Sequence, residues 1–145
     1  MQNLPFRDGA IDAAFAVECM CVVPNADRKD LLQELKRVLA PGGSFLSIDF
    51  FSGDQDYART FLGELCEMSG LEIKDMVDLT EPAKRSIETM EHERSAQFER
   101  LPWFVRRSEF GEGLRETFCL VGTRRYNKWM NGERSYMLSH MTVKA

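Results

Sequence analysis

Almost every residue is apolar in Ile11-Asp12-Ala13-Ala14-Phe15-Ala16-Val17, a stretch that follows a turn signal at Arg7-Asp8-Gly9. The stretch is too short for a typical helix, whereas a strand buried on both faces has just such a continuous apolar run. It therefore predicts a strand buried on both faces, as in a parallel sheet.

An amphipathic helix is expected next, over Asn25–Leu39, because its apolar residues recur on one face. Asn25 or Asp27 can cap the start of this helix by accepting bonds from free backbone N–H groups. Pro41-Gly42-Gly43 is expected to end it, since proline cannot continue a helix and glycine accepts a positive φ. The following Ser44–Phe50 is the next predicted strand.

A second helix and strand follow in the same order. Tyr57, Phe61, Leu65 and Met68 recur at helical spacing, and Gly70 closes the helix. Leu71–Leu79 then alternates apolar and charged residues, which is typical of an edge strand with one solvent-exposed face. Two successive strand–helix units predict a right-handed, parallel α/β sheet.

The segment between this sheet and the C-terminus differs in composition. Thr80-Glu81-Pro82 predicts the start of a charged, largely exposed helix that runs to about Arg100. Eight of the fifteen aromatic residues fall between residues 98 and 136, and part of that stretch, from Leu114 onward, follows helical spacing. They fit either a helix docked on the body or a lid over an apolar ligand. Ser135–Val143 is predicted as the last strand.

Composition limits the possible classes of protein. The chain has 145 residues, 43% of them hydrophobic, which fits one globular domain. It has no apolar run of membrane-spanning length and no signal segment, so a cytosolic protein is expected. A net charge of −4 without a basic stripe argues against nucleic acid or an anionic membrane as the main partner. Small molecules or other proteins remain as the expected partners.

The cysteines give no sign of a metal site. Their spacing fits neither a disulfide framework nor a zinc site, because no second pair completes four ligands. Reduced thiols packed as small apolar groups are expected, and no metal is assigned. The four are Cys19, Cys21, Cys66 and Cys119.

Two motifs together resemble a known family. Leu4-Pro5-Phe6-Arg7-Asp8-Gly9-Ala10-Ile11-Asp12-Ala13-Ala14-Phe15 and Leu35-Lys36-Arg37-Val38-Leu39-Ala40-Pro41-Gly42-Gly43 resemble segments of the class I, Rossmann-like methyltransferases that use S-adenosylmethionine. In that family they lead into the fourth strand and precede the fifth, about one helix apart. Val17-Glu18-Cys19, ahead of Pro24, is most similar to the sterol and tocopherol type.

The resemblance implies an incomplete domain. Members begin with a strand ending in a glycine-rich E/D-x-G-x-G-x-G loop and use a later acidic residue to hold the ribose, and neither is found here. The chain is thus similar to the C-terminal half only, with helices on both faces of the sheet and a helical insertion before the last strand. The expected parts are a βαβαβ core (1–79), a helical substrate cover (80–134) and the last strand (135–145).

The resemblance also implies cofactor contacts. Val17, Glu18 and Cys19 fall at the carboxyl end of the fourth family strand, where members meet the methionine part of S-adenosylmethionine, and ligands of α/β sheets collect at such ends. Met1 and Gln2 correspond to the loop that borders the adenine. For Glu18 the alternative is a solvated loop charge or a helix N-terminal acid.

The sequence offers few side chains that could take part in the methyl-transfer reaction itself. Methyl transfer requires positioning of the nucleophile, with a base only where that nucleophile still carries a proton. Candidate bases are Glu18 and His140, although His140 also fits a hydrogen-bonded sheet residue. Candidate substrate-facing aromatics, each of which could equally pack in a core, are Trp103, Tyr126, Trp129 and Tyr136.

We therefore expect S-adenosylmethionine-dependent methyl transfer to a small, partly apolar molecule, carried out by a longer enzyme of which this chain is a fragment. The alternative is a truncated, non-catalytic relative that acts as a binding partner or subunit. In either case, the uncovered edge of the strand Ile11–Val17 predicts self-association or a partner that supplies the missing strands.

Overall fold

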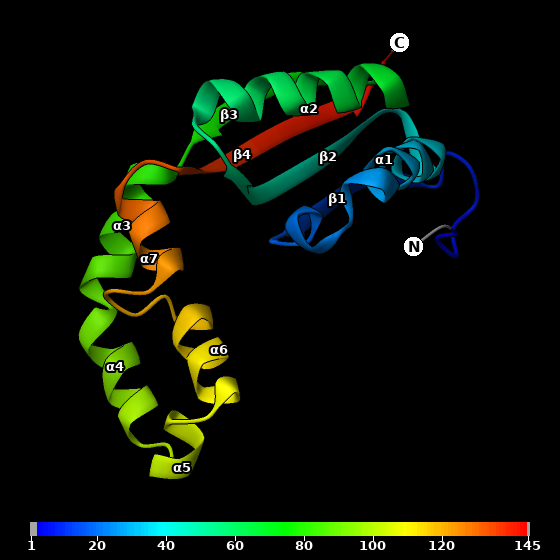
Figure 1. Ribbon diagram of the computed structural model, residues 1–145. Helices are drawn as coiled ribbons and strands as arrows, with labels where there is room; N and C mark the ends of the chain where they lie inside the picture. Colours follow the sequence, from blue (N-terminus) through cyan, green and yellow to red (C-terminus); the bar gives the residue numbers. More distant parts are fainter. Residues whose placement is uncertain (1–2, 145) are drawn as a thin grey trace. The chain divides into compact units, whose positions relative to one another are not determined.

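The computed structural model describes residues 3–144 and forms two compact units. The first contains the chain up to Leu79 together with the last strand from Ser135, and the second contains Thr80–Arg134. Figure 1 shows a sheet with helices in the first unit and helices alone in the second. The expected α/β sheet with a helical insertion before its last strand is confirmed.

The sheet has four strands in the order β1-β2-β4-β3. β1 pairs with β2 in parallel, and β3 pairs with β4 antiparallel. As expected from its alternation, β3 lies at one edge, while β1 occupies the other. The bounds are β1 Ile11–Val17, β2 Leu39–Ser52, β3 Leu71–Asp78 and β4 Arg134–Val143.

Two helices of the first unit share one core on one face of this sheet. The helices are α1 (Asn25–Val38) and α2 (Gln55–Ser69), and a 3-10 turn, η1, spans Met20–Val22. Leu32 of α1 and Leu65 of α2 pack in the same buried cluster as Phe45 of β2. Successive right-handed crossovers in one direction place helices on the same side. The expected helices on the other face are not found among residues 3–144 of this unit.

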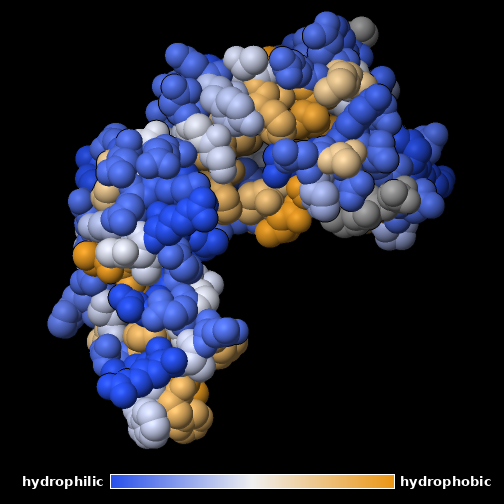
Figure 2. Space-filling view, in the orientation of Figure 1, coloured by the Kyte–Doolittle hydropathy of each residue, from blue (hydrophilic) through white to orange (hydrophobic). Residues whose placement is uncertain are grey.

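The uncovered face carries exposed apolar side chains. Phe15 of β1 is 82% exposed and pairs with Leu46 of β2, which is also exposed, as is Val17. Apolar (orange) surface is visible on this unit in Figure 2. The expectation that β1 is buried on both faces is therefore wrong for this chain, because β1 is an edge strand and the helices cover one face only.

Pro41-Gly42-Gly43 lies within β2 instead of forming the end of α1. α1 ends at Val38, and the pairing with β1 jumps from Ile11↔Leu39 to Ala13↔Ser44, so these residues form a bulge. Gly42 has φ +76°, a conformation that favours glycine. Because pairing with β1 already begins at Leu39, β2 starts earlier than the predicted strand start at Ser44.

The second unit contains five short helices. The single charged helix expected up to Arg100 is divided at Met90, and the helical spacing from Leu114 to Trp129 is divided by residues 118–123. Ser108 and Thr123 cap the last two helices with their hydroxyl oxygens. The helices are α3 Thr80–Thr89, α4 Glu91–Glu99, α5 Trp103–Arg106, α6 Glu109–Thr117 and α7 Arg124–Met130.

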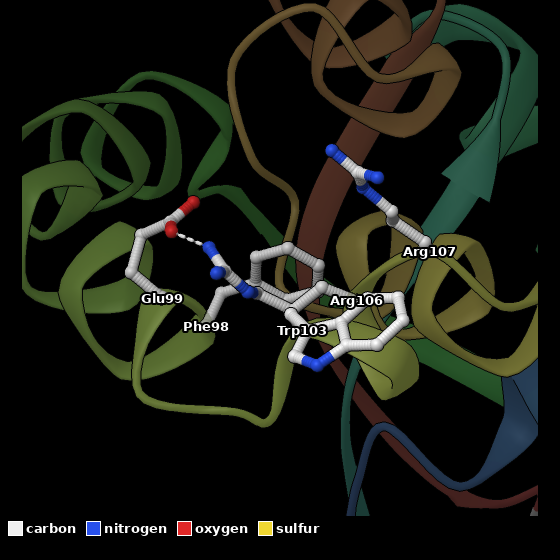
Figure 3. Close-up of a pocket in the computed structure, with 5 residues that line it drawn as sticks. All are labelled: Phe98, Glu99, Trp103, Arg106 and Arg107. Carbon is white, nitrogen blue, oxygen red and sulfur yellow. Dashed lines mark hydrogen bonds and ion pairs between the residues drawn. The ribbon is translucent and has the colours of Figure 1, made fainter.

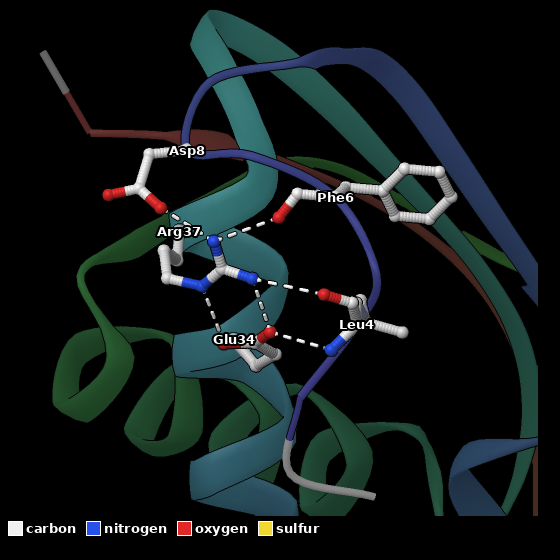
Figure 4. A network of polar contacts seen from close by, with 5 residues as sticks. All are labelled: Leu4, Phe6, Asp8, Glu34 and Arg37. Carbon is white, nitrogen blue, oxygen red and sulfur yellow. Dashed lines mark hydrogen bonds and ion pairs between the residues drawn. The ribbon is translucent and has the colours of Figure 1, made fainter.

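A polar network fixes the N-terminal segment against α1 (Figure 4). Arg37 donates to both carboxylate oxygens of Glu34, at 2.8 and 2.6 Å, to Asp8 at 2.5 Å, and to the carbonyls of Phe6 and Leu4 at 3.0 and 3.3 Å. Glu34 also accepts the backbone N–H of Leu4 at 2.7 Å. The two motifs recognised in the sequence are therefore joined through one guanidinium.

Candidate active site

The loop that follows β1 begins with a residue in an unusual backbone conformation. Glu18, directly after β1, has φ 51°, which is uncommon for a residue with a side chain. Its backbone N–H donates to the carbonyl of Ile48 at 2.7 Å, so the pairing of β1 with β2 continues to this residue. The chain then turns sharply into η1, and the exposed Glu18 side chain lies at the carboxyl ends of two parallel strands.

A buried carboxylate at the end of β2 anchors that turn. Asp49 is 1% exposed and accepts the backbone N–H groups of Met20 at 3.1 Å and Cys21 at 3.0 Å. The hydroxyl of Ser47 donates to it at 3.0 Å. Asp49 is not among the site residues predicted from the sequence, although a lone acidic residue in an apolar strand signals a need for hydrogen-bond donors.

Tyr136 reaches the same place from β4. Its hydroxyl donates to Oε1 of Glu18 at 3.2 Å. Burial and the neighbouring Glu18 carboxylate raise the pKa of Tyr136 to about 12, so the phenol stays protonated at neutral pH. Tyr136 therefore serves as a hydrogen-bond donor, and Glu18 as the acceptor.

The Cys21 thiol of this loop is a poor nucleophile at neutral pH. Burial and the Asp49 side chain raise the pKa of Cys21 to about 11, which leaves it a thiol. Cys19 is exposed, and its sulfur lies 3.3 Å from the carbonyl oxygen of Val17. No group of three His, Cys, Asp or Glu side chains that could hold a metal ion occurs in residues 3–144.

An aromatic wall adjoins the loop. Tyr57 and Phe61 of α2 stack with their ring centroids 5.9 Å apart, and the Arg28 guanidinium lies 5.4 Å from the Phe61 centroid. A hollow of about 130 Å³ is lined by Cys21, Asn25, Arg28, Phe50, Phe51, Ser52, Tyr57 and Phe61. The carboxyl end of β2 therefore combines polar anchors with apolar surface.

The structure brings only some of the predicted site residues together. Val17, Glu18, Cys19 and Tyr136 meet at one end of the sheet, whereas Met1 and Gln2 lie outside the described residues. His140 lies four residues further along β4, about 13 Å away at strand spacing. There its Nε2 pairs with the hydroxyl of Ser44 at 3.0 Å.

The remaining aromatic candidates belong to the second unit. Trp103 is 67% exposed and, with Phe98, Glu99, Arg106 and Arg107, lines an open hollow in which Arg106 pairs with Glu99 (Figure 3). Trp129 is only 7% exposed and belongs to that unit's core. Tyr126 is half-buried on α7. Trp103 is therefore the aromatic candidate of this unit most available to a ligand.

No helix within the described residues has the length and apolar character needed to cross a membrane.

Comparison with known proteins gives consistent matches. A family model described as a methyltransferase domain matches residues 1–47. The chain is 40% identical over 58 residues to the sterol 4-C-methyltransferase strm-1 of Caenorhabditis elegans, covering 40% of this chain and 16% of that protein. It is 41% identical over 54 residues to squalene methyltransferase 1 of Botryococcus braunii, covering 37% and 14%.

Solved structures share the fold over nearly the whole chain. The [4+2]-cyclase SpnF has a TM-score of 0.73 at 19% identity, covering 99% of this chain and 53% of that one. Geranyl diphosphate C-methyltransferase from Streptomyces coelicolor has a TM-score of 0.65 at 18% identity, covering 98% and 51%. The chain thus spans about half the length of these structures, and a cyclase among them illustrates that fold alone does not fix the reaction.

Proposed function

Because the chain belongs to the class I, Rossmann-like methyltransferases, we propose that it forms part of an enzyme that transfers a methyl group from S-adenosylmethionine to a small molecule. The observation that carries this proposal is the anchored loop at the carboxyl ends of β1 and β2. Ligands of α/β sheets collect at such ends. A methyltransferase model matches residues 1–47, which include β1 and this loop.

The residues present fit one wall of a cofactor site. Val17, Glu18 and Cys19 have exposed side chains at the strand ends and would border the methionine part of the cofactor. The N–H groups of Met20 and Cys21 are occupied by Asp49, so they shape the loop instead of binding a ligand. A glycine-rich loop and a ribose-binding acid must come from a preceding part of the protein or from a partner.

The bound cofactor would supply an electrophilic methyl group on a sulfonium. The chain's own contribution is positioning, which supplies most of the acceleration of an in-line displacement. The Glu18 carboxylate, oriented by the Tyr136 hydroxyl, can attract a cationic group or accept a proton from an acceptor hydroxyl or ammonium. Tyr136 and Cys21 keep their protons at neutral pH, so neither competes with Glu18 for that role.

An apolar methyl acceptor is the class we favour. Sterol and squalene methyltransferases are among the relatives in sequence, and both are named for largely apolar molecules. We propose that the Thr80–Arg134 unit covers the acceptor, with Trp103 as a contact and Tyr126 and Tyr136 as further candidates, whereas Trp129 packs in the core of that unit. The exposed indole of Trp103 supports this assignment.

A second candidate function rests on the uncovered edge of the sheet. β1 is an edge strand with exposed Phe15 and Val17, and such an edge pairs readily with another strand. A non-catalytic relative of the methyltransferases could use this edge to bind a partner that supplies the missing strands. This alternative predicts complex formation without methyl transfer.

The test is a mass-spectrometric screen with methyl-labelled S-adenosylmethionine, using the complete protein in which this chain occurs. Phenols, amines, sterols and prenyl lipids are the acceptors to offer. We expect label in an apolar acceptor, and we expect Glu18→Gln to lower kcat/KM while Glu67→Gln, an exposed acid on α2, leaves it unchanged. A cofactor-binding protein that transfers label to no acceptor, or a Glu18→Gln variant with unchanged kinetics, would contradict the proposal.

A further inference from the structure

The second unit contains a hollow lined mostly by cationic side chains. Its volume is about 450 Å³, within the range of roughly 300–1,000 Å³ of small-molecule sites. Four cations and one carboxylate line it: Arg124, Arg125, Lys128, Arg134 and Glu116. Figure 2 shows strongly hydrophilic (deep blue) surface over α7, which carries three of these residues.

The single carboxylate is already engaged by backbone. Oε1 and Oε2 of Glu116 accept the N–H groups of Arg124 and Arg125 at 2.9 and 2.8 Å. Burial raises the pKa of Glu116, but these two N–H groups, together with the charges of Arg125 and Arg124, outweigh it and hold the pKa below its ordinary value. Within residues 3–144 no salt bridge joins Glu116 to a cationic side chain. Glu116 therefore fixes the start of α7 and leaves an excess of positive charge.

The fold holds these cations close together despite their repulsion. Arg124 and Lys128 lie four residues apart on one face of α7, a spacing at which like charges destabilise a helix. Burial raises the pKa of the Cys119 thiol, and the charges of Arg94, Arg125 and Arg134 oppose that rise. Arg125 and Arg134, which also line the hollow, are thus among the positive charges that act on Cys119. An anion bound in the hollow would relieve the repulsion between Arg124 and Lys128.

The net charge of the chain is also unevenly distributed, with a positive second unit and a negative remainder. Thr80–Arg134 contains 11 Lys and Arg against 9 Asp and Glu, whereas the rest of the chain contains 8 against 14. A positive unit in an acidic protein is where an anionic ligand would accumulate.

We propose that the hollow beside α7 binds the phosphate or diphosphate group of a small molecule. Planar guanidinium groups match phosphate oxygens with paired donors, and a lysine adds a compact charge. Even without Arg134, the three cations of α7 against Glu116 leave two formal positive charges, which suits a diphosphate better than a monocarboxylate. That this group belongs to the methyl acceptor rests on the proposed function; the binding itself does not.

Calorimetric titration of the chain with inorganic pyrophosphate tests the site. We expect Arg124→Gln combined with Lys128→Gln to weaken pyrophosphate binding at least tenfold. Neither side chain forms a hydrogen bond or salt bridge in the described structure, so the variant should keep its thermal midpoint. The matched control is Arg85→Gln with Arg100→Gln, which removes the same charge from exposed positions outside the hollow and should leave binding unchanged. If the double variant melts early, Lys128→Gln alone is compared, with an expected loss of about threefold.

Several outcomes would overturn the proposal. These are no binding of pyrophosphate, equal weakening in the control, or acetate binding as tight as pyrophosphate. Binding to phosphatidate vesicles without binding of free pyrophosphate would assign the surface to lipid headgroups instead. Since no S-adenosylmethionine is present in this experiment, its failure leaves methyl transfer untouched, and a protein without methyl transfer could still bind pyrophosphate here.

Discussion

Arg37 explains why two separate sequence motifs occur together in this chain. It lies in the second motif and binds the carbonyls of Leu4 and Phe6 and the carboxylate of Asp8, all in the first. Glu34 completes the contact by accepting the N–H of Leu4. The segment Leu4–Asp8 is thus fixed by α1 instead of by local turn chemistry alone.

This contact predicts a specific loss of stability in acid. The Arg37 guanidinium and the Leu4 N–H lower the pKa of Glu34 from 4.5 to about 2. A carboxylate with a depressed folded-state pKa contributes stability above about pH 4.5, which is lost as the pH falls toward 2. Urea unfolding across that range should show the stability difference between the protein and Glu34→Gln shrinking as pH falls.

Glu67→Gln is the control for that experiment, because Glu67 is an exposed acid on α2. It should leave the pH dependence as in the unmodified protein. A Glu34→Gln variant whose stability difference is constant from pH 5 to pH 2 would show that the Arg37 contact has no energetic role.

The turn η1 depends on Asp49 in the neighbouring strand. In Asp49→Asn, an amide NH₂ would face the N–H donors of Met20 and Cys21 or the hydroxyl of Ser47, leaving a buried donor unpaired. We expect a loss of about 1.5–3 kcal/mol, the usual range for hydrogen bonds to a buried charge. Asp12→Asn, at an exposed position of β1, should cost less than about 0.5 kcal/mol. Equal thermal midpoints for the two variants would refute the anchoring role.

Two tryptophans of the second unit have opposite expected effects. Trp129 is buried, so Trp129→Ala should cost about 3–5 kcal/mol of stability. Trp103 is exposed, so Trp103→Ala should keep the thermal midpoint and raise KM for the acceptor in the complete enzyme. A Trp103→Ala variant with unchanged KM would remove Trp103 from the substrate site.

The regular elements could be predicted from sequence because their signals are local. β1, α1, α2, β3 and β4 follow from apolar periodicity and glycine or proline boundaries. The bulge at Pro41-Gly42-Gly43 could not, since it depends on register with β1. The Glu18–Tyr136 contact joins residues 118 positions apart, so only the assembled sheet brings them together.

Across the whole molecule, the open edge of β1 predicts self-association. Unpaired strand groups beside exposed Phe15 and Val17 favour pairing with a second chain. Phe15→Lys with Val17→Lys should shift the chain toward monomer in light scattering, because lysine on an edge strand opposes pairing. Val121→Lys, at an exposed position in the second unit, should not. A chain that is monomeric without these substitutions would contradict the prediction.

The central proposal is that this chain forms one wall of a methyltransferase cofactor site and that the rest of a domain completes it. Calorimetric titration with S-adenosylmethionine of residues 1–145 and of the complete protein in which they occur tests it most directly. We predict micromolar binding by the complete protein and none by residues 1–145 alone. Micromolar binding by monomeric residues 1–145, or no binding by the complete protein, would contradict it.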